Sequence, residues 1–156
     1  MPKNQDKTNG YLLPNVTTCI VACSAAEARL FLSDKRFGDW VQLDTLKNPE
    51  ATLREQDLTS DRPGRAFDRF GRGRHAMSPA ESAREHELVT FAHEISQHLA
   101  KAHATGQFSK LVLIADPSFL GHLRQKLPAA LKRVLHCEVP KNPTEFDRDR
   151  LRSLFT

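Results

Sequence analysis

The sequence has little cysteine and no long hydrophobic run, and each scarcity excludes a class of protein. Cys19, Cys23 and Cys137 are an odd number, and the first two lie four residues apart on one predicted strand. We therefore predict buried small side chains rather than a disulfide framework. No apolar run approaches the ~20 residues that cross a bilayer, and the polar beginning, MPKNQDKTNG, lacks the apolar region of a secretory signal. The expected location is the cytoplasm.

The composition is that of a soluble globular protein. Of the 156 residues, 39% are hydrophobic and 27% are charged, which suits one domain with one core. We expect a disordered or loosely attached tail over residues 1–14 and a single domain over residues 15–156. The net charge of +4 permits a polyanion as a partner.

Hydrophobic periodicity and turn residues predict an α/β fold. Ser78, Pro79 and Glu81 form the sequence of a capping box at the start of a long helix, and Asp116 before Pro117 is typical of a second helix start. The expected elements are strands Val16–Cys23, Ala28–Ser33 and Trp40–Asp44, a helix from Pro79 towards Gly106, strand Leu111–Ala115, helices from Pro117 to about Leu127 and over Pro128–Arg133, strand Leu135–Val139, and helix Thr144–Leu154. Three antiparallel strands followed by two parallel ones, flanked by helices, are the series of a ribonuclease-H-like mixed five-stranded sheet.

The pattern does not favour a metal-dependent nuclease on this sheet. Such an enzyme needs converging carboxylates, and the first strand has none, while Asp116 is explained by helix capping. His86 and His93 lie seven residues apart, with Glu87 and Glu94 beside them, rather than at the i, i+4 spacing of zinc ligands. A solvated helix flank is the better interpretation, and we predict no metal and no cofactor.

The segment between the third strand and the long helix, about residues 48–78, has almost no apolar periodicity, which in a compact domain is typical of a functional loop. From Ser60 to His75 it holds five arginines against two aspartates, a local excess of 5 − 2 = +3. Arginine binds phosphate, phenylalanine stacks on unpaired bases, and glycine permits close backbone approach. The predicted RNA-binding residues are Arg62, Arg65, Arg69, Arg72, Arg74, Phe67, Phe70, Gly71 and Gly73. The alternative is that these arginines pair with acids of their own segment, or only aid solubility.

The stretches GRGRHAMSPAESAREHELVTFAHEISQHL and SKLVLIADPSFLGHL resemble the middle domain of archaeal and eukaryotic class-one peptide-release factors. With REQDLTSDRPGRAFDRFGRGRHAMSP and LVLIADPSFLGHLR, the chain looks still closer to the bacterial relatives of that domain, the host attachment protein family. The resemblance runs from about Thr17 to Phe155.

The release-factor resemblance implies a Gly-Gly-Gln tip that positions water against peptidyl-tRNA, but this chain departs from it. Gly71, Arg72 and Gly73 match, whereas Arg74 replaces the second glycine and His75 replaces the glutamine. Arg74 disfavours the backbone conformations that glycine allows, and His75 is not isosteric with glutamine. These departures disfavour release by the same mechanism, and we favour a protein that is not an enzyme. If it is one, we expect a metal-independent hydrolase that acts on a peptidyl-tRNA ester or RNA with His75 as catalytic base.

Three functions follow as hypotheses. The leading one is a release-factor-like protein that binds the ribosome or structured RNA through the arginine and glycine segment, in translation-related stress or rescue. The second is a host-attachment or host-interaction factor that acts indirectly or by docking to a protein. The third is the hydrolase just described. None involves a membrane or a small-molecule cofactor.

Overall fold

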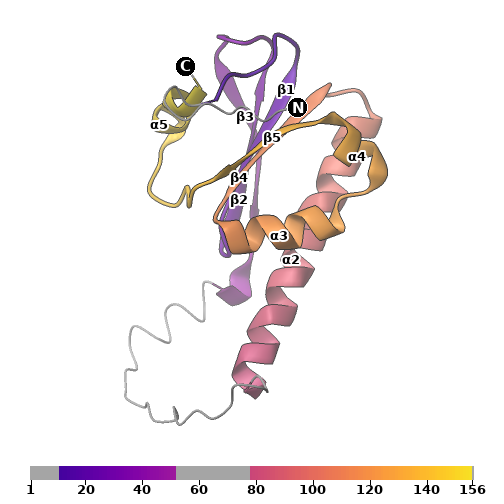
Figure 1. Ribbon diagram of the computed structural model, residues 1–156, viewed down its shortest axis with the longest axis vertical. Coiled ribbons are helices and arrows are strands. Elements are labelled where there is room, and N and C mark those ends of the chain that lie inside the picture. Colours follow the sequence, from indigo (N-terminus) through magenta and orange to yellow (C-terminus); the bar gives the residue numbers. More distant parts are fainter. Residues whose placement is uncertain (1–10, 52–77, 156) are drawn as a thin grey trace.

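A mixed five-stranded sheet organises the computed structural model, which describes residues 11–51 and 78–155 (Figure 1). The strands lie in the order β3-β2-β1-β4-β5. β1 pairs antiparallel with β2 and parallel with β4, β2 pairs antiparallel with β3, and β4 pairs parallel with β5. The predicted α/β fold, with three antiparallel strands and then two parallel ones, is confirmed. The strands are β1 (Thr18–Cys23), β2 (Glu27–Ser33), β3 (Trp40–Lys47), β4 (Lys110–Ala115) and β5 (Leu135–Pro140).

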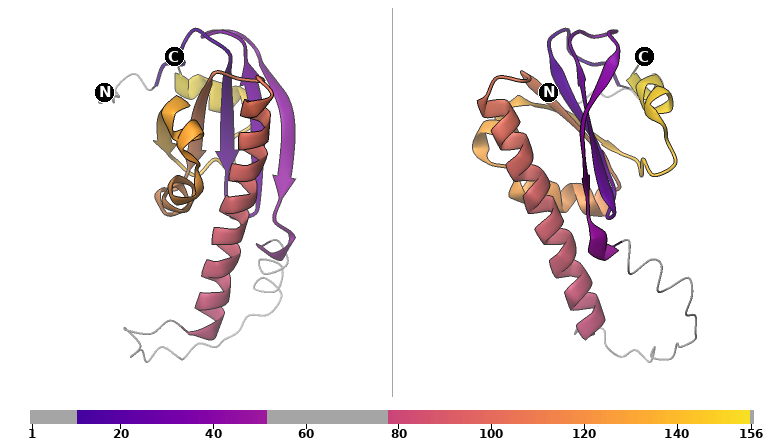
Figure 2. Two further views of the ribbon diagram at one scale, coloured as in Figure 1. Left: turned by 90° about the vertical axis from the view of Figure 1, so that its right-hand side faces the viewer. Right: turned by 180° about the vertical axis from the view of Figure 1, so that it is seen from behind.

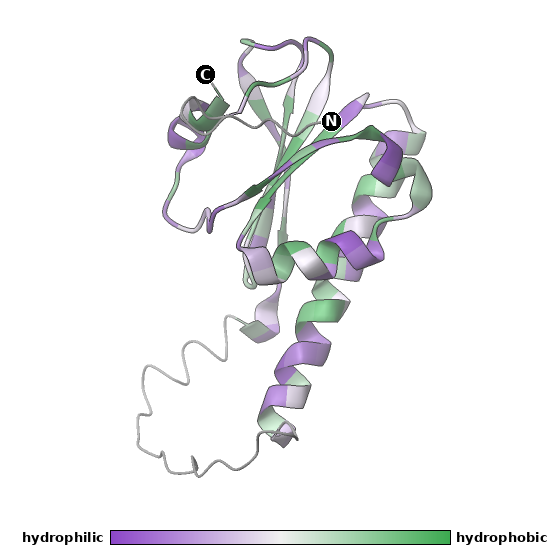
Figure 3. Ribbon diagram, in the orientation of Figure 1, coloured by the Kyte–Doolittle hydropathy of each residue, from purple (hydrophilic) through white to green (hydrophobic). Residues whose placement is uncertain are grey.

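The central strand, β1, is buried along its whole length because both faces of the sheet are covered. Its side chains alternate between two cores, as the two-residue period of a strand requires. Cys19, Val21 and Cys23 point to one core, and Ile20 and Ala22 to the other. A strand buried on both faces reads as a continuous apolar run, and TCIVAC is such a run. Green ribbon in the middle of the sheet marks this hydrophobic centre (Figure 3).

Three helices cover the first face of the sheet. They are α2 (Pro79–Ala104), α3 (Pro117–Lys126) and α4 (Ala129–Val134). The long helix α2 crosses the sheet and packs against α3, where the rings of Phe91 and Phe119 have centroids 6.1 Å apart (Figure 2). Ile95 and Leu99, one and two turns along α2, are fully buried in the same core. Phe91, Ile95 and Leu99 therefore lie on the packing face of α2.

The second face is covered by the end of the chain, α5 (Arg148–Arg152) with the 3₁₀ helix η1 (Ser153–Phe155). Trp40 of β3 lies under this layer, with its ring centroid 5.7 Å from that of Phe155. The prediction of a helix from Thr144 was wrong at its beginning. Asp147 caps α5 by accepting a hydrogen bond from the backbone N–H of Arg150 at 2.8 Å, so the helix starts after Asp147.

The last four residues of the predicted tail are attached to the domain, so that part of the tail prediction was wrong. The backbone N–H of Tyr11 donates to the carbonyl oxygen of Leu154 at 2.9 Å. Leu13 is buried in the second core, and its carbonyl accepts a hydrogen bond from Arg36 Nε at 2.7 Å. Residues 1–10 lie outside the described residues.

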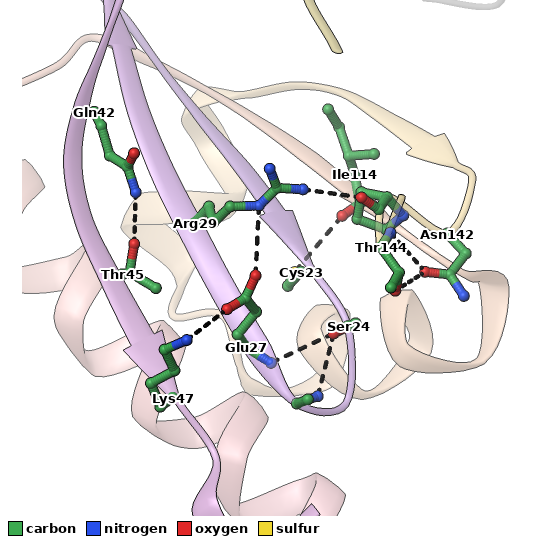
Figure 4. Close-up of polar contacts among 12 residues, drawn as sticks. Cys23, Ser24, Glu27, Arg29, Gln42, Thr45, Lys47, Ile114, Asn142 and Thr144 are labelled. Carbon is green, nitrogen blue, oxygen red and sulfur yellow. Dashed lines mark hydrogen bonds and ion pairs between the residues drawn. The ribbon is translucent and has the colours of Figure 1, made fainter. Parts of the chain in front are cut away.

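The cysteines are small buried side chains, as predicted for Cys19 and Cys23. All three are free thiols; Cys19 and Cys23 are fully buried, and Cys137 is half-buried. Burial raises the pKa of Cys19 and of Cys137 to about 12 and raises the pKa of Cys23 as well. The Cys23 thiol donates to the carbonyl oxygen of Ile114 at 3.7 Å, which needs the protonated form (Figure 4).

The predicted helix starts are confirmed by side-chain hydrogen bonds. Ser78 and Glu81 form the reciprocal capping box of α2. The Asp116 carboxylate accepts a hydrogen bond from the backbone N–H of Phe119 at 2.9 Å at the start of α3. Asp116 therefore caps a helix, which is the role its position before Pro117 predicted.

Replacing Asp116 with alanine is expected to lower the free energy of unfolding by about 1 kcal/mol. The change leaves the N–H of Phe119 without its side-chain acceptor. Urea denaturation measures the loss, with Ser118→Ala as the control because Ser118 is exposed in the first turn of the same helix. An equal loss in both variants would contradict the capping role.

Candidate functional site

The residues predicted to bind RNA or to act in catalysis all fall between residues 52 and 77, outside the described residues. They are Arg62, Arg65, Phe67, Arg69, Phe70, Gly71, Arg72, Gly73, Arg74 and His75. We call residues 52–77 the arginine segment. The structure describes the two positions at which the chain enters and leaves this segment, near Ala51 and Ser78.

The first attachment point follows β3. Asn48 is buried, and its backbone N–H and side-chain amide donate to the carbonyl oxygens of Ala26 and Ala25 at 2.8 and 2.9 Å. Residues 49–51 are helical, and Ala51 is buried. The irregular loop predicted to begin at about residue 48 is therefore ordered structure as far as Ala51.

Polar contacts hold the same end of the sheet (Figure 4). Ser24 Oγ accepts a hydrogen bond from the backbone N–H of Glu27 at 3.4 Å in the β1–β2 turn. The Glu27 carboxylate lies 2.9 Å from Lys47 Nζ and 3.7 Å from Arg29 Nε. Arg29 Nη2 in turn donates to the carbonyl oxygen of Pro143 at 2.9 Å, across 114 residues of sequence. These contacts join β2 to β3 and to the connection after β5. The last described residues before the arginine segment therefore follow a part of the sheet that is held by several polar contacts.

The second attachment point is the beginning of α2. In the capping box, the two hydrogen bonds between Ser78 and Glu81 are each 3.1 Å long. Every residue from Ser78 to His86 is exposed, and this part of the helix extends beyond the end of the sheet (Figures 1 and 2). The contact of Glu85 with His122 Nε2 of α3, at 3.3 Å, lies at the base of the projecting part.

Two histidines on α2 are placed as the sequence predicted, but one neighbouring acid is not. His86 and His93 are both exposed, which confirms a solvated flank for them. Glu87 differs, because it is only 6% exposed where α2 meets the domain. The sequence placed Glu87 on the solvated flank because glutamate is ordinarily a surface residue.

The described residues contain no cluster of metal ligands. No group of three or more His, Cys, Asp or Glu side chains within residues 11–51 and 78–155 is arranged to hold a metal ion. Ser118 lies exposed in the first turn of α3. In the same two ranges, we find no helix that combines the length and the apolar character needed to span a membrane.

A cavity that the sequence did not single out lies at the opposite end of β3 from the arginine segment. Its volume is about 220 Å³, and Arg36, Phe37, Trp40, Arg152 and Phe155 are among its lining residues. The only local signal was Phe37, a large apolar residue in a polar turn. The cavity forms between segments more than 100 residues apart, which local patterns do not reveal.

Comparison with known proteins places the chain in a family. A family model described as "Protein required for attachment to host cells" matches residues 19–154. A stretch of 75 residues is 30% identical to an uncharacterised protein of Rickettsia prowazekii (strain Madrid E). That stretch is 47% of this chain and 50% of the relative, so the match spans about half the length of that protein. Because the family model covers most of the sequence, the chain belongs to the family of proteins described as required for attachment to host cells.

Proposed function

We propose that this protein serves host attachment by docking to another macromolecule through the arginine segment and the projecting beginning of α2. The family match supports a role in attachment. The observation that carries the docking mode is the continuous exposure of Ser78 to His86 on a helix whose later turns are buried.

The projecting turns of α2 add little to the stability of this domain. Most helical stability in proteins comes from packing of an apolar face, and residues 79–86 bury none of their side chains. Eight residues correspond to about 12 Å of helix. By contrast, Phe91, Ile95 and Leu99 anchor the rest of α2 in the first core. Exposed helical turns that continue a packed helix are suited to present a neighbouring segment to a partner.

The shape of this end favours a macromolecular partner over a small molecule. Small ligands bind in concave pockets that bury most of their surface, whereas a projecting helix end is convex. The capping box at Ser78 and the hydrogen bonds of Asn48 fix both attachment points of the arginine segment. Fixed attachment points reduce the conformational entropy that is lost when a partner binds.

Binding of ribosomes or structured RNA is the second candidate, supported by the charge of the arginine segment. Five arginines against two aspartates between Ser60 and His75 give a local charge of 5 − 2 = +3 in a chain whose total is +4. Such a segment binds phosphates with a strong dependence on salt. Kinship with release factors, the ribonuclease-H-like identity of the fold and hydrolysis by His75 stay predictions.

The test replaces the five arginines with glutamine in the full chain. A strain that lacks the protein receives the wild type or the variant, and cells attached to host cells are counted. We expect the variant to restore at least tenfold fewer attached cells, because the segment loses its charged contacts. The control replaces five exposed cations that lie elsewhere, namely Lys35, Lys101, Lys132, Arg133 and Lys141. Full attachment with the five-arginine variant would contradict the proposal.

Co-sedimentation with ribosomes across a salt series separates the two candidates. Docking to a non-RNA partner predicts that the five-arginine variant loses attachment although the wild type does not sediment with ribosomes. Salt-sensitive sedimentation that disappears in the variant would instead make RNA binding the primary activity and attachment its indirect result.

A further inference from the structure

The cavity at the beginning of β3 joins an apolar floor to a charged rim. It lies between the β2–β3 turn and the end of the chain, near the segment around Leu13. Leu13, Trp40 and Phe155 are almost completely buried and form the apolar part. The rim residues are Arg36, Phe37 and Arg152.

The two arginines of the rim are half-buried, and neither has an acidic partner among the described residues. Arg36 Nε donates to the carbonyl oxygen of Leu13 at 2.7 Å, and Arg152 Nη2 donates to that of Gly38 at 3.4 Å. No ion pair joins either guanidinium to a carboxylate of residues 11–51 or 78–155. Because each guanidinium carries five N–H donors, both keep donors for an external carboxylate.

Another acid in the cavity does not neutralise this pair. Asp149 also lines it, but its side chain is 75% exposed and its ion pair is with Arg148, at 3.6 Å. Among the residues that line the cavity, two arginines outnumber one aspartate, so the lining has a net positive charge. The charge complement of this rim is therefore an anion.

Phe37 is the most exposed large hydrophobic residue of the described chain, with 70% of its surface accessible. It sits in the β2–β3 turn, where the backbone N–H of Gly38 donates to the carbonyl oxygen of Lys35 at 3.0 Å. An exposed aromatic ring beside an apolar cavity is a ready surface for a second apolar group, and aromatic and arginine residues are enriched at protein interfaces.

The volume of the cavity limits the size of the group that can bind in it. Pockets for cofactors and drug-sized ligands are roughly 300 to 1,000 Å³, so about 220 Å³ is small for them. It is suited to one large side chain. The ligand that meets both conditions carries an apolar side chain with a carboxylate next to it.

We propose that this cavity is a second docking site, which binds a short acidic peptide segment of a partner protein. One apolar side chain of the peptide lies against Phe37 and Trp40, and a neighbouring carboxylate binds Arg36 and Arg152. β3 has eight residues, which span roughly 25 Å. The cavity is at its beginning and the arginine segment follows its end, so this site does not depend on the function proposed above.

Trp40 gives a direct readout, because it is the only tryptophan of the chain and it lines the cavity. The probe is a synthetic peptide with one phenylalanine between two pairs of glutamates. Titration into the full chain is followed by tryptophan fluorescence and by the indole N–H signal in NMR spectra. Two matched peptides replace the phenylalanine with alanine or the glutamates with glutamine.

We expect a saturable change in the Trp40 signal with the acidic phenylalanine peptide and at least tenfold weaker binding of both matched peptides. The double variant Arg36→Gln, Arg152→Gln is expected to weaken binding at least tenfold. Phe37→Ser is expected to weaken binding as well. Because Phe37 is exposed, this variant tests the site without a change to the core, whereas the double arginine variant also loses the hydrogen bond from Arg36 to Leu13. Arg133→Gln, on an exposed turn of α4, is the control and leaves binding unchanged.

Several results would overturn the inference. One is a Trp40 signal that does not respond to the peptide at millimolar concentration. Another is equal binding by wild type, Phe37→Ser and the double arginine variant. A response to adenosine monophosphate without a response to the peptide would identify a nucleotide site instead. A Trp40 signal that changes on concentrating the protein alone would indicate that a second copy occupies the cavity.

Discussion

Raising the pH from 9 to 11 is expected to lower the free energy of unfolding by about 4 to 5 kcal/mol through two buried thiols. Burial raises the pKa of Cys19 to about 12 and also raises the pKa of Cys23. Both side chains lie in the first core on β1, where a thiolate would lack solvation. The folded chain therefore keeps both protons at pH 11.

The direction follows from the protons bound by each state. Well below about pH 8 both thiols are protonated in the folded and the unfolded chain, so their contribution there is complete and does not vary with pH. Above pH 9 the unfolded chain releases these protons and the folded chain does not, which favours unfolding by about 2 kcal/mol for each thiol at pH 11. The loss continues until the pH reaches the folded pKa.

Urea denaturation between pH 8 and pH 11 measures this loss in the wild type and in the double variant Cys19→Ala, Cys23→Ala. Alanine lowers the stability at every pH, so the informative quantity is the slope against pH, which should be shallower in the variant. The variants Cys137→Ala and Tyr11→Phe account for the third thiol and the one tyrosine, because burial raises the pKa of each of these groups as well. Parallel slopes in wild type and double variant would refute the prediction.

Replacing Phe91 with alanine is expected to lower the free energy of unfolding by about 3 to 5 kcal/mol. Phe91 is almost fully buried between α2 and the first core, and its ring packs against that of Phe119. Its removal takes away an apolar contact between α2 and α3 and leaves a cavity in the first core. The projecting turns bury no other side chain that compensates.

Thr90→Ala is the matched control, because Thr90 precedes Phe91 and is exposed. The control should change the stability by less than about 0.5 kcal/mol. Guanidinium denaturation followed by circular dichroism compares the two variants. A similar, small effect of both substitutions would show that α2 is not anchored at Phe91.

The fold was largely predictable because its elements carry local signals. A continuous apolar run identified the buried strand β4, and Ser78, Glu81 and Asp116 identified two helix starts through capping chemistry. The strand order followed from these elements and the right-handed crossover rule. At Thr144 the local signal was misleading, because Asp147 competes as the cap of α5.

Features that depend on long-range contacts were not predictable. Tyr11 and Leu13 follow a polar beginning, and only their contacts with the end of the chain and with the second core show that they are part of the domain. The presence of Arg36 and Arg152 in the lining of one cavity also depends on long-range contacts. The composition of the arginine segment indicates that it binds phosphate, but the segment has no apolar periodicity that would predict its conformation. The roles of its residues therefore stay a prediction.

The position of β1 between β2 and β4 has a consequence for synthesis on the ribosome. β1 can pair with β2 as soon as that strand emerges, but Thr18 pairs with Lys110, which is 110 − 18 = 92 residues later. At about 5 to 20 residues per second, this edge of a buried strand waits about 5 to 20 s for its partner. An unpaired apolar edge is prone to pair with other chains. This edge of β1 therefore stays open to pairing with other chains until β4 has been made.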